Sequence, residues 1–230
     1  ATLIVTDNDL QYVRQRGAVG NFMHFPIFRG APTSSVPVEP LNQLTVGFVG
    51  SFLHSPNIDA VQYFLQATWP TILKEVPDAK FLIWGNGLND DQKSAWSMVP
   101  SVEVRGWFAT WNDVVAETRV LVSPLRFGAG MKGKVVSNLI HGRPVVGTVI
   151  SFEGFQTQFL NDTIMTDDSS QMAKSTIKIL LSNEAWQSAL SAGRAAMGNG
   201  FEQGAELERV RNLLNSEISR KKSQPVTISR

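Results

Sequence analysis

The 230-residue chain contains no cysteine, which excludes disulfide bonds, thiol nucleophiles and cysteine-ligated zinc sites. Its three histidines do not have the spacing of metal ligands, so we expect no bound transition metal. No apolar run approaches the roughly 20 residues that cross a bilayer, and the first residues lack the pattern of a signal peptide. These absences are typical of a reducing compartment, and we expect a cytoplasmic protein.

The chain also lacks an excess of charge of either sign. Lysine and arginine number 21 against 20 aspartate and glutamate residues, which gives a formal net charge of +1. A nearly neutral chain has no global field that would steer it onto nucleic acid, so we expect no nucleic-acid partner and only a local anion site. With 43% hydrophobic and 18% charged residues, the composition is that of a globular protein of one or two domains.

Composition along the chain indicates four segments. Residues 1–27 contain two short extended runs around a helix and begin with a strand already under way, so we expect them to be the remnant of a longer N-terminal domain. Residues 28–43 are rich in proline, glycine and serine, as is typical of a linker. Residues 44–200 form the main domain, and residues 201–230 a C-terminal helix with a basic tail. That tail is a solvated terminus or is attracted to a membrane surface.

Apolar, β-rich runs alternate with helical patterns after the linker. The expected strands are 44–49, 80–84, 102–104, 120–123, 144–148 and 163–165. The expected helices are one from Ser55 to about residue 73, and others near 111–117, 132–141, 171–181, 184–197 and 205–219. This alternation predicts an α/β fold, a Rossmann-like parallel sheet with helices on both faces.

A glycine-rich turn at residues 128–134 joins the run 120–123 to the next helix. Glycines at a helix start let backbone N–H groups approach a phosphate, and Lys132 and Lys134 add positive charge there. The same residues match the dinucleotide fingerprint, with Glu153 20 residues beyond Gly133, although that fingerprint belongs in the first strand-helix unit. They also match a P-loop except for Val135 in place of its serine or threonine. A tight turn with solvated lysines remains a further alternative.

An ordered series of short motifs spans residues 44–200. The motifs are Gly50-Ser-Phe52, His54-Ser-Pro-Asn-Ile-Asp-Ala60, Trp69-Pro70, Pro77-Asp-Ala79, Ile83-Trp-Gly-Asn-Gly87, Val104-Arg-Gly-Trp107, Pro124 to Lys134, His141 to Thr148 and Glu153-Gly154. In this order they resemble the donor-binding, C-terminal half of retaining GT-B glycosyltransferases of the group 1, family 4-like type. The resemblance implies an enzyme, a hexosyltransferase, that this chain contains incompletely, with most of the N-terminal acceptor domain missing.

The resemblance implies a site for a nucleotide diphosphate sugar. This sugar would be a substrate and not a cofactor, and its binding would not require a metal. Lys132 and Lys134 would stabilise the leaving diphosphate as the catalytic residues. The implied nucleotide-sugar-binding residues are Gly50, Ser51, Gly85, Asn86, Gly87, Trp107, Gly128, Ala129, Gly130, Met131, Ser137 and Glu153. Trp107 would stack on the base or serve buried packing, and Glu153 would meet the sugar or anchor its loop.

The acceptor would be a glycan, a lipid or a small molecule, and a lipid acceptor would place the protein at the inner face of a membrane. At Ser51, Pro56, Ala129 and Ser137 the chain lacks the charged residues that the family commonly carries. These departures favour one alternative, a degenerate, non-catalytic domain that serves as a binding or scaffolding module. A nucleotide-sugar epimerase is the other.

Overall fold

A computed structural model describes residues 2–4, 7–20, 22–24, 38–162, 164–197, 208, 211–216 and 219. The chain divides into two compact units, one of Pro32–Gly198 and one of Ala1–Ala31 with Asn199–Arg230. Most of the expected linker and the basic tail lie outside the described residues. Of the expected helix 205–219, the described residues 208, 211–216 and 219 are helical, and the others lie outside the described residues.

The described N-terminal residues of the smaller unit form a strand-helix-strand motif. Strand β1 (Thr2–Ile4) leads into helix α1 (Asp7–Gln15) and then strand β2 (Phe22–His24). The two strands are parallel, with Thr2 opposite Phe22. A parallel pair needs a crossover connection, and α1 supplies it, with Leu10 buried. The two expected extended runs and the helix between them are thus present.

The larger unit is built on a five-stranded parallel sheet, which confirms the predicted α/β fold. Its strands are β3 (Thr45–Val49), β4 (Lys80–Trp84), β5 (Val102–Gly106), β6 (Val120–Ser123) and β7 (Val145–Gly147). Their order across the sheet is β5-β4-β3-β6-β7. Strand β3 is central, with Val46 paired to Phe81 on β4 and to Val120 on β6, and it is buried along its whole length, as expected of a central strand.

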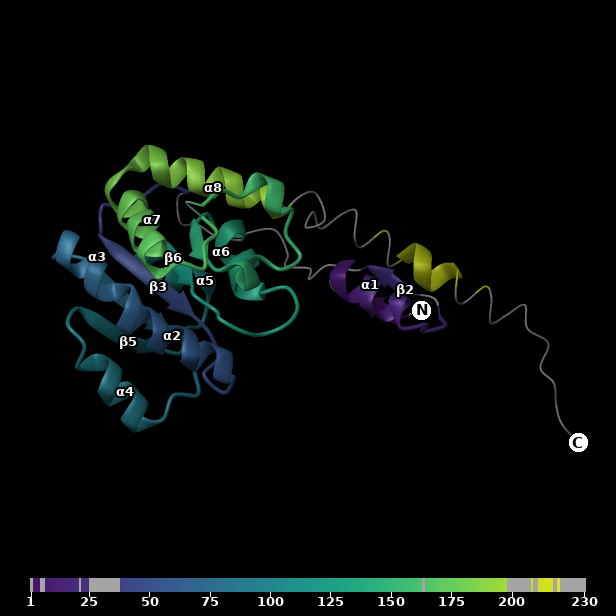
Figure 1. Ribbon diagram of the computed structural model, residues 1–230, viewed down its shortest axis with the longest axis horizontal. Helices are drawn as coiled ribbons and strands as arrows, with labels where there is room; N and C mark the ends of the chain where they lie inside the picture. The colour runs from purple at the N-terminus through teal and green to yellow at the C-terminus, as the bar shows by residue number, and fades with distance from the viewer. Residues whose placement is uncertain are drawn as a thin grey trace, which may run out of the picture. The chain divides into compact units, whose positions relative to one another are not determined.

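Helices connect successive strands and follow the last one (Figure 1). The connecting helices are α2 (Ser55–Ala67), α3 (Trp69–Glu75), α4 (Asp90–Ser97), α5 (Trp111–Glu117) and α6 (Gly133–Ile140). After β7 come the 3-10 turns η1 (Val149–Phe152) and η2 (Thr157–Phe159) and the helices α7 (Ser169–Leu181) and α8 (Asn183–Met197). Helices α2, α3 and α7 pack together, and α6 packs against α5 and α8. Because β4 and β7 lie on opposite sides of the β3–β6 pair, right-handed crossovers place α2 and α6 on opposite faces of the sheet.

The structure differs from the prediction at three places. The helix expected from Ser55 to about residue 73 is two helices, because the chain breaks at Thr68 and restarts with Pro70 in the first turn of α3. Helix α4 was not predicted. The strand expected at 163–165 is reduced, within the described residues, to one bridge between Gly147 and Met165.

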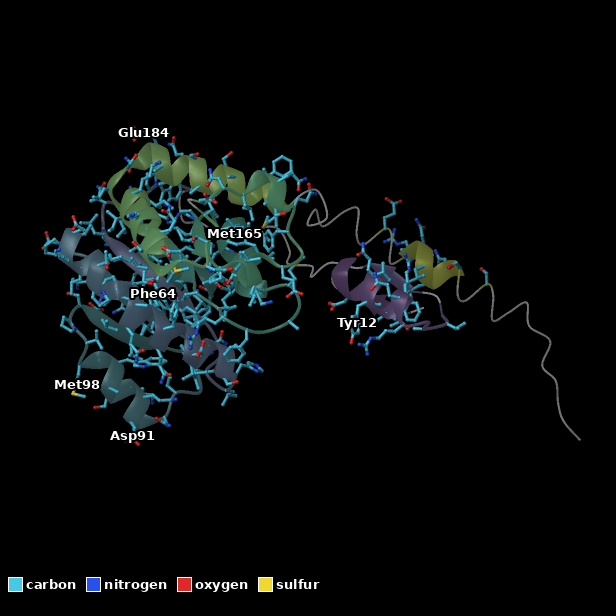
Figure 2. All side chains as sticks on the ribbon, in the orientation of Figure 1. Tyr12, Phe64, Asp91, Met98, Met165 and Glu184 are labelled. Carbon is cyan, nitrogen blue, oxygen red and sulfur yellow. The ribbon has the colours of Figure 1, made fainter. Side chains whose placement is uncertain are left out.

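The core between α2, α3 and the sheet is aromatic. The ring centroids of Phe64 and Phe81 are 4.8 Å apart, and those of Trp69 and Phe81 are 5.6 Å apart. Figure 2 shows Phe64 within the body of the unit, whereas Met98 and Glu184 lie at its periphery. This packing fixes α2 on β3 and β4, and therefore fixes the loop that precedes α2.

A fully buried arginine fixes the other side of the sheet. The Arg143 guanidinium donates to the carbonyl oxygens of Val115, Thr118 and Gly142 at 2.7 to 3.0 Å. Burial lowers the pKa of Arg143 to about 10, so the side chain remains charged at neutral pH. These bonds join the end of α5 to the turn between α6 and β7, and so hold α6 in place.

Candidate functional site

The candidate site lies where β3 and β6 end. These neighbouring strands finish at Val49 and Ser123, and the helices that follow them lie on opposite faces of the sheet. Such a reversal of strand order opens a crevice outside the carboxyl ends of the strands, the usual ligand position in open α/β sheets. The expected loops after β3, β4, β5, β6 and β7 all reach this edge.

The loops after β3 and β4 are locked together through their backbones. The Gly50 N–H donates to the Trp84 carbonyl oxygen at 3.0 Å, and the Phe52 N–H donates to the Asn86 carbonyl oxygen at 2.7 Å. Gly85 has a φ of +138°, and a Cβ atom there would lie 1.7 Å from the Gly50 carbonyl oxygen. Only glycine fits at position 85. The structure therefore brings Gly50 and Asn86, both predicted site residues, side by side.

The glycine turn after β6 is exposed and offers unpaired donors. Gly128 and Gly130 have φ values of +130° and +74°, and Lys132 is the N-cap of α6. Within the described residues, the backbone N–H groups of residues 129–134 donate no hydrogen bond. Six free donors beside the positive end of a helix suit an anion with several oxygens, such as a phosphate.

Lys132 is paired with an acid across the turn. Its Nζ donates to Glu153 Oε2 at 3.0 Å and also to the Gly130 carbonyl oxygen. Glu153 directly follows η1, beyond the end of β7, so the pair links the loops after β6 and β7. Lys132 is thus the partner that Glu153 would need for its predicted role as a loop anchor. The same ion pair cancels much of the Lys132 charge.

Lys134 lies against an amide and an aromatic ring, and no acid among the described residues pairs with it. Its Nζ donates to Asn57 Oδ1 and lies 4.3 Å from the centroid of the Phe48 ring. Burial, with a smaller contribution from the charge of Lys132, lowers the pKa of Lys134 to about 7. A cation that is half ionised at neutral pH gains its proton when an anion binds. Asn57 is not among the predicted site residues, although the sequence holds a signal for it: it follows Ser55-Pro56 at a helix start, at a position where the apolar stripe of the helix predicts an apolar residue.

A second contact spans the crevice at its exposed rim. Arg126, in the loop after β6, forms a two-pronged ion pair with Asp59 on α2, and its guanidinium lies 4.8 Å from the Tyr63 ring centroid. The hydrogen bonds from Arg126 lower the pKa of the Asp59 carboxyl group. This pair joins the loop after β6 to α2, and neither residue is among the predicted site residues.

Trp107 lies at the far end of the same edge, after β5. Its side chain is 71% exposed, so the alternative of buried packing is wrong. It lines a hollow of about 420 Å³ together with Trp84, Phe108 and Asp113. An exposed indole beside a hollow can stack on a planar ligand group. Gly87, also predicted here, lies against Leu53 of the loop after β3.

Two predicted site residues are buried. Ser137 is 1% exposed, and its hydroxyl makes no hydrogen bond within the described part of the chain, while its carbonyl oxygen lies 2.8 Å from His141 Nδ1. Met131 is also buried, whereas Ala129 beside it is exposed. A ribose contact by Ser137 would require α6 to shift, so its predicted role and that of Met131 remain predictions.

The described ranges hold no group of three or more histidine, aspartate or glutamate side chains placed to share a metal ion. Among the helices that the structure describes, none combines the length and the apolar character that a bilayer crossing needs.

Comparison with known proteins identifies relatives of this unit. A family model for "Glycosyl transferases group 1" matches residues 43–182. A curated relative, the uncharacterized 44.6 kDa protein in the cps region of Klebsiella pneumoniae, is 26% identical over 144 residues, which are 60% of this chain and 37% of that protein.

Solved structures share the fold. A TarM mutant from S. aureus, crystallised with fondaparinux, alpha-GlcNAc-glycerol and UDP, superposes with a TM-score of 0.74 at 18% identity, covering 93% of this chain and 43% of that one. Anabaena HepE with UDP and glucose gives a TM-score of 0.68 at 14% identity, covering 93% and 62%. WaaG, a glycosyltransferase of lipopolysaccharide biosynthesis, gives 0.62 at 13%, covering 86% and 58%. The chain therefore spans less than two thirds of each of these relatives.

Proposed function

Because this chain belongs to the group 1 glycosyl transferase family, we propose that its larger unit binds a nucleotide diphosphate sugar for hexosyl transfer to a glycan, lipid or small-molecule acceptor. The observation that carries the proposal is that Lys134, which no acid among the described residues pairs with, belongs to the same turn as the six backbone N–H groups of residues 129–134, which donate no hydrogen bond within the described part of the chain. Two adjacent phosphates match such a set of donors better than one carboxylate does.

In this proposal the diphosphate lies between the loop after β3 and the glycine turn. Gly50 and Ser51 approach it from one side, and Gly128, Gly130 and Lys134 from the other. As the bond from the sugar to the diphosphate breaks, negative charge grows on the leaving phosphate oxygen, and Lys134 and the N–H groups stabilise it. Lys132 contributes once the sugar draws Glu153 away from it.

The nucleoside extends toward β5. Trp107 stacks on the base, and the loop from Gly85 to Gly87 bounds the nucleoside on the inner side. TarM and HepE, which share this fold and whose structures contain UDP, support a nucleotide as the ligand. No metal is needed in this proposal, because the lysines and backbone dipoles supply the positive charge.

The acceptor side belongs to a second domain, of which residues 1–27 are a part in this proposal. The larger unit would then bind donor, and efficient turnover would need the acceptor domain as well. We place the protein in the cytoplasm, and at the inner face of a membrane when the acceptor is a lipid.

Calorimetry with a series of nucleoside diphosphate sugars tests donor binding. We expect micromolar to millimolar affinity for one or a few of them, and a loss of about 10-fold or more for Lys134→Ala. Lys93→Ala is the matched control, because Lys93 is an exposed lysine on α4 paired only with Asp90. Absence of binding by folded protein at millimolar donor would contradict the proposal.

A binding module without catalysis is the second candidate. It is favoured by the burial of Ser137, which leaves no described side chain at that position to hold the ribose. Such a module predicts that Lys132→Ala and Lys134→Ala leave the cellular role intact. Loss of glycan synthesis in cells that carry either folded variant would exclude it, and a product formed without any acceptor would instead indicate an epimerase.

A further inference from the structure

Asn57 is the buried polar residue at this edge whose role the proposed function leaves open. It lies in the first turn of α2 and is only 8% exposed. Its Nδ2 donates to the Ser51 carbonyl oxygen at 2.7 Å, and its Oδ1 accepts from Lys134 Nζ. The Asn57 side chain thus joins the loop after β3 to α6, at the sheet edge where β3 and β6 end.

The orientation of the Asn57 amide is fixed by these two partners. A carbonyl oxygen can only accept and an ammonium group can only donate, so the NH₂ must face Ser51 and the oxygen must face Lys134. The backbone leaves room for this arrangement because residue 50 is glycine: a Cβ atom there would lie 2.8 Å from Asn57 Cγ. The amide oxygen is therefore presented to Lys134 by a rigid backbone.

Lys134 needs such an anchor because its side chain is long and its ammonium group is partly removed from water. Its other close contact is the Phe48 ring. A carboxylate in place of Asn57 would hold the ammonium group as well but would cancel its charge, as Glu153 does for Lys132. A neutral amide holds the group and leaves the charge available.

We propose that Asn57 is a positioning residue for donor binding: it holds the Lys134 ammonium group at the crevice between β3 and β6 without neutralising it. This inference rests on the proposed function, since the diphosphate is what the ammonium group would meet. The charged groups on neighbouring elements are Lys132 and Glu153, which pair with each other, and Asp59 and Arg126, which also pair.

The test is a double-mutant cycle read by donor affinity. We expect Asn57→Ala to weaken the binding of the best nucleoside diphosphate sugar by about 5- to 10-fold, and Asn57→Asp by more than about 10-fold, because the carboxylate neutralises Lys134. In the Lys134→Met background the effect of Asn57→Ala should shrink to less than about 2-fold. A purely structural role for Asn57 would give the same loss in both backgrounds, and that result would overturn the inference.

A measurement without donor separates this inference from the proposed function. Chemical acetylation of Lys134, followed across pH by mass spectrometry, reports the titration of its amine in the free protein. Asn57→Asp should move the midpoint upward by about one pH unit or more, because a carboxylate favours the charged form. An unchanged midpoint would show that Asn57 does not act on Lys134, and would refute the inference while wild-type donor binding still upheld the proposed function.

Two further outcomes are decisive. If wild-type protein binds no donor, the proposed function fails and the inference fails with it. If Asn57→Asp shifts the Lys134 midpoint but leaves donor affinity unchanged, only the inference fails. Asn89→Ala serves as the matched control, because Asn89 also begins a helix and bonds to it but lies on α4, away from Lys134.

Discussion

Replacing Lys134 by methionine should stabilise the larger unit at neutral pH while weakening donor binding. Folding lowers the pKa of Lys134 from 10.5 to about 7, so the buried charge costs about 5 kcal/mol relative to the solvated one. Methionine removes this cost and keeps most of the apolar contact. Two losses oppose this gain in stability. The Asn57 oxygen is left without its hydrogen-bond donor, which costs about 1–3 kcal/mol, and the contact with the Phe48 ring is lost, which costs about 1 kcal/mol. The net gain should be about 1–3 kcal/mol at pH 7.

The gain in unfolding free energy from Lys134→Met should decrease as the pH rises. A lysine whose pKa is lowered by folding destabilises the protein fully at pH values below its folded pKa, and the penalty disappears as the pH rises toward the unfolded value of 10.5. The advantage of Lys134→Met is therefore constant below about pH 7 and falls by about 1.4 kcal/mol per pH unit above it. The two proteins should become equally stable near about pH 8 to 9.

Urea unfolding, followed by tryptophan fluorescence at several pH values, measures the stability difference between Lys134→Met and wild type. All six tryptophans lie in the larger unit, so the signal reports on that unit alone. Lys93→Met provides the control, because exposed Lys93 should give a difference that does not change over the same pH range. A Lys134→Met variant that is less stable than wild type at pH 7, or a stability difference that is flat with pH, would refute the reasoning.

Four further substitutions probe the loops at this edge of the sheet. Gly85→Ala should lower the unfolding free energy in urea titrations by about 3 kcal/mol or more, because its Cβ atom would overlap the Gly50 carbonyl oxygen. Gly106→Ala, at a φ of +76° in open space, should lower it by only about 1–2 kcal/mol. Equal losses for the two variants would argue against the overlap. Trp107→Ala should leave the unfolding free energy within about 0.5 kcal/mol but reduce donor affinity in calorimetry by about 10-fold, and unchanged affinity would remove Trp107 from the site. Asn89→Ala should lower the unfolding free energy by about 1 kcal/mol through loss of the α4 cap, with donor affinity unaltered.

The strands could be predicted because each is a short run of apolar, β-branched residues that the sheet buries. Lys80–Trp84 and Val120–Ser123 were predicted with the observed bounds, and so was the helix Trp111–Glu117. Helix α4 was missed because Trp96 is its one buried residue, so it carries no apolar stripe. Its signal was the capping box, in which Asn89 and Gln92 each bond to the other's backbone N–H.

The site could be predicted only in part. The alternation of elements and the family motifs indicated which loops meet at the sheet edge and that Lys132 and Lys134 lie there. They could not tell these two lysines apart, because the difference comes from partners far along the chain: Glu153 lies 21 residues from Lys132, and Asn57 lies 77 residues from Lys134. Contacts across the β3–β6 junction depend on how two separately folded strand-helix units are set side by side, and no local pattern encodes that.

The interlocked loops at Gly50 and Gly85 bear on how this edge can change over evolution. These loops are joined by backbone hydrogen bonds, and a Cβ atom at Gly85 would lie only 1.7 Å from the Gly50 carbonyl oxygen. The two loops therefore have no room for an inserted residue or a side chain. The loops after β6 and β7 are joined instead by the side chains of Lys132 and Glu153, which tolerate changes of length and sequence around them. New recognition properties should therefore arise by insertions in those two loops, and libraries that aim to alter what this edge binds are best confined to them.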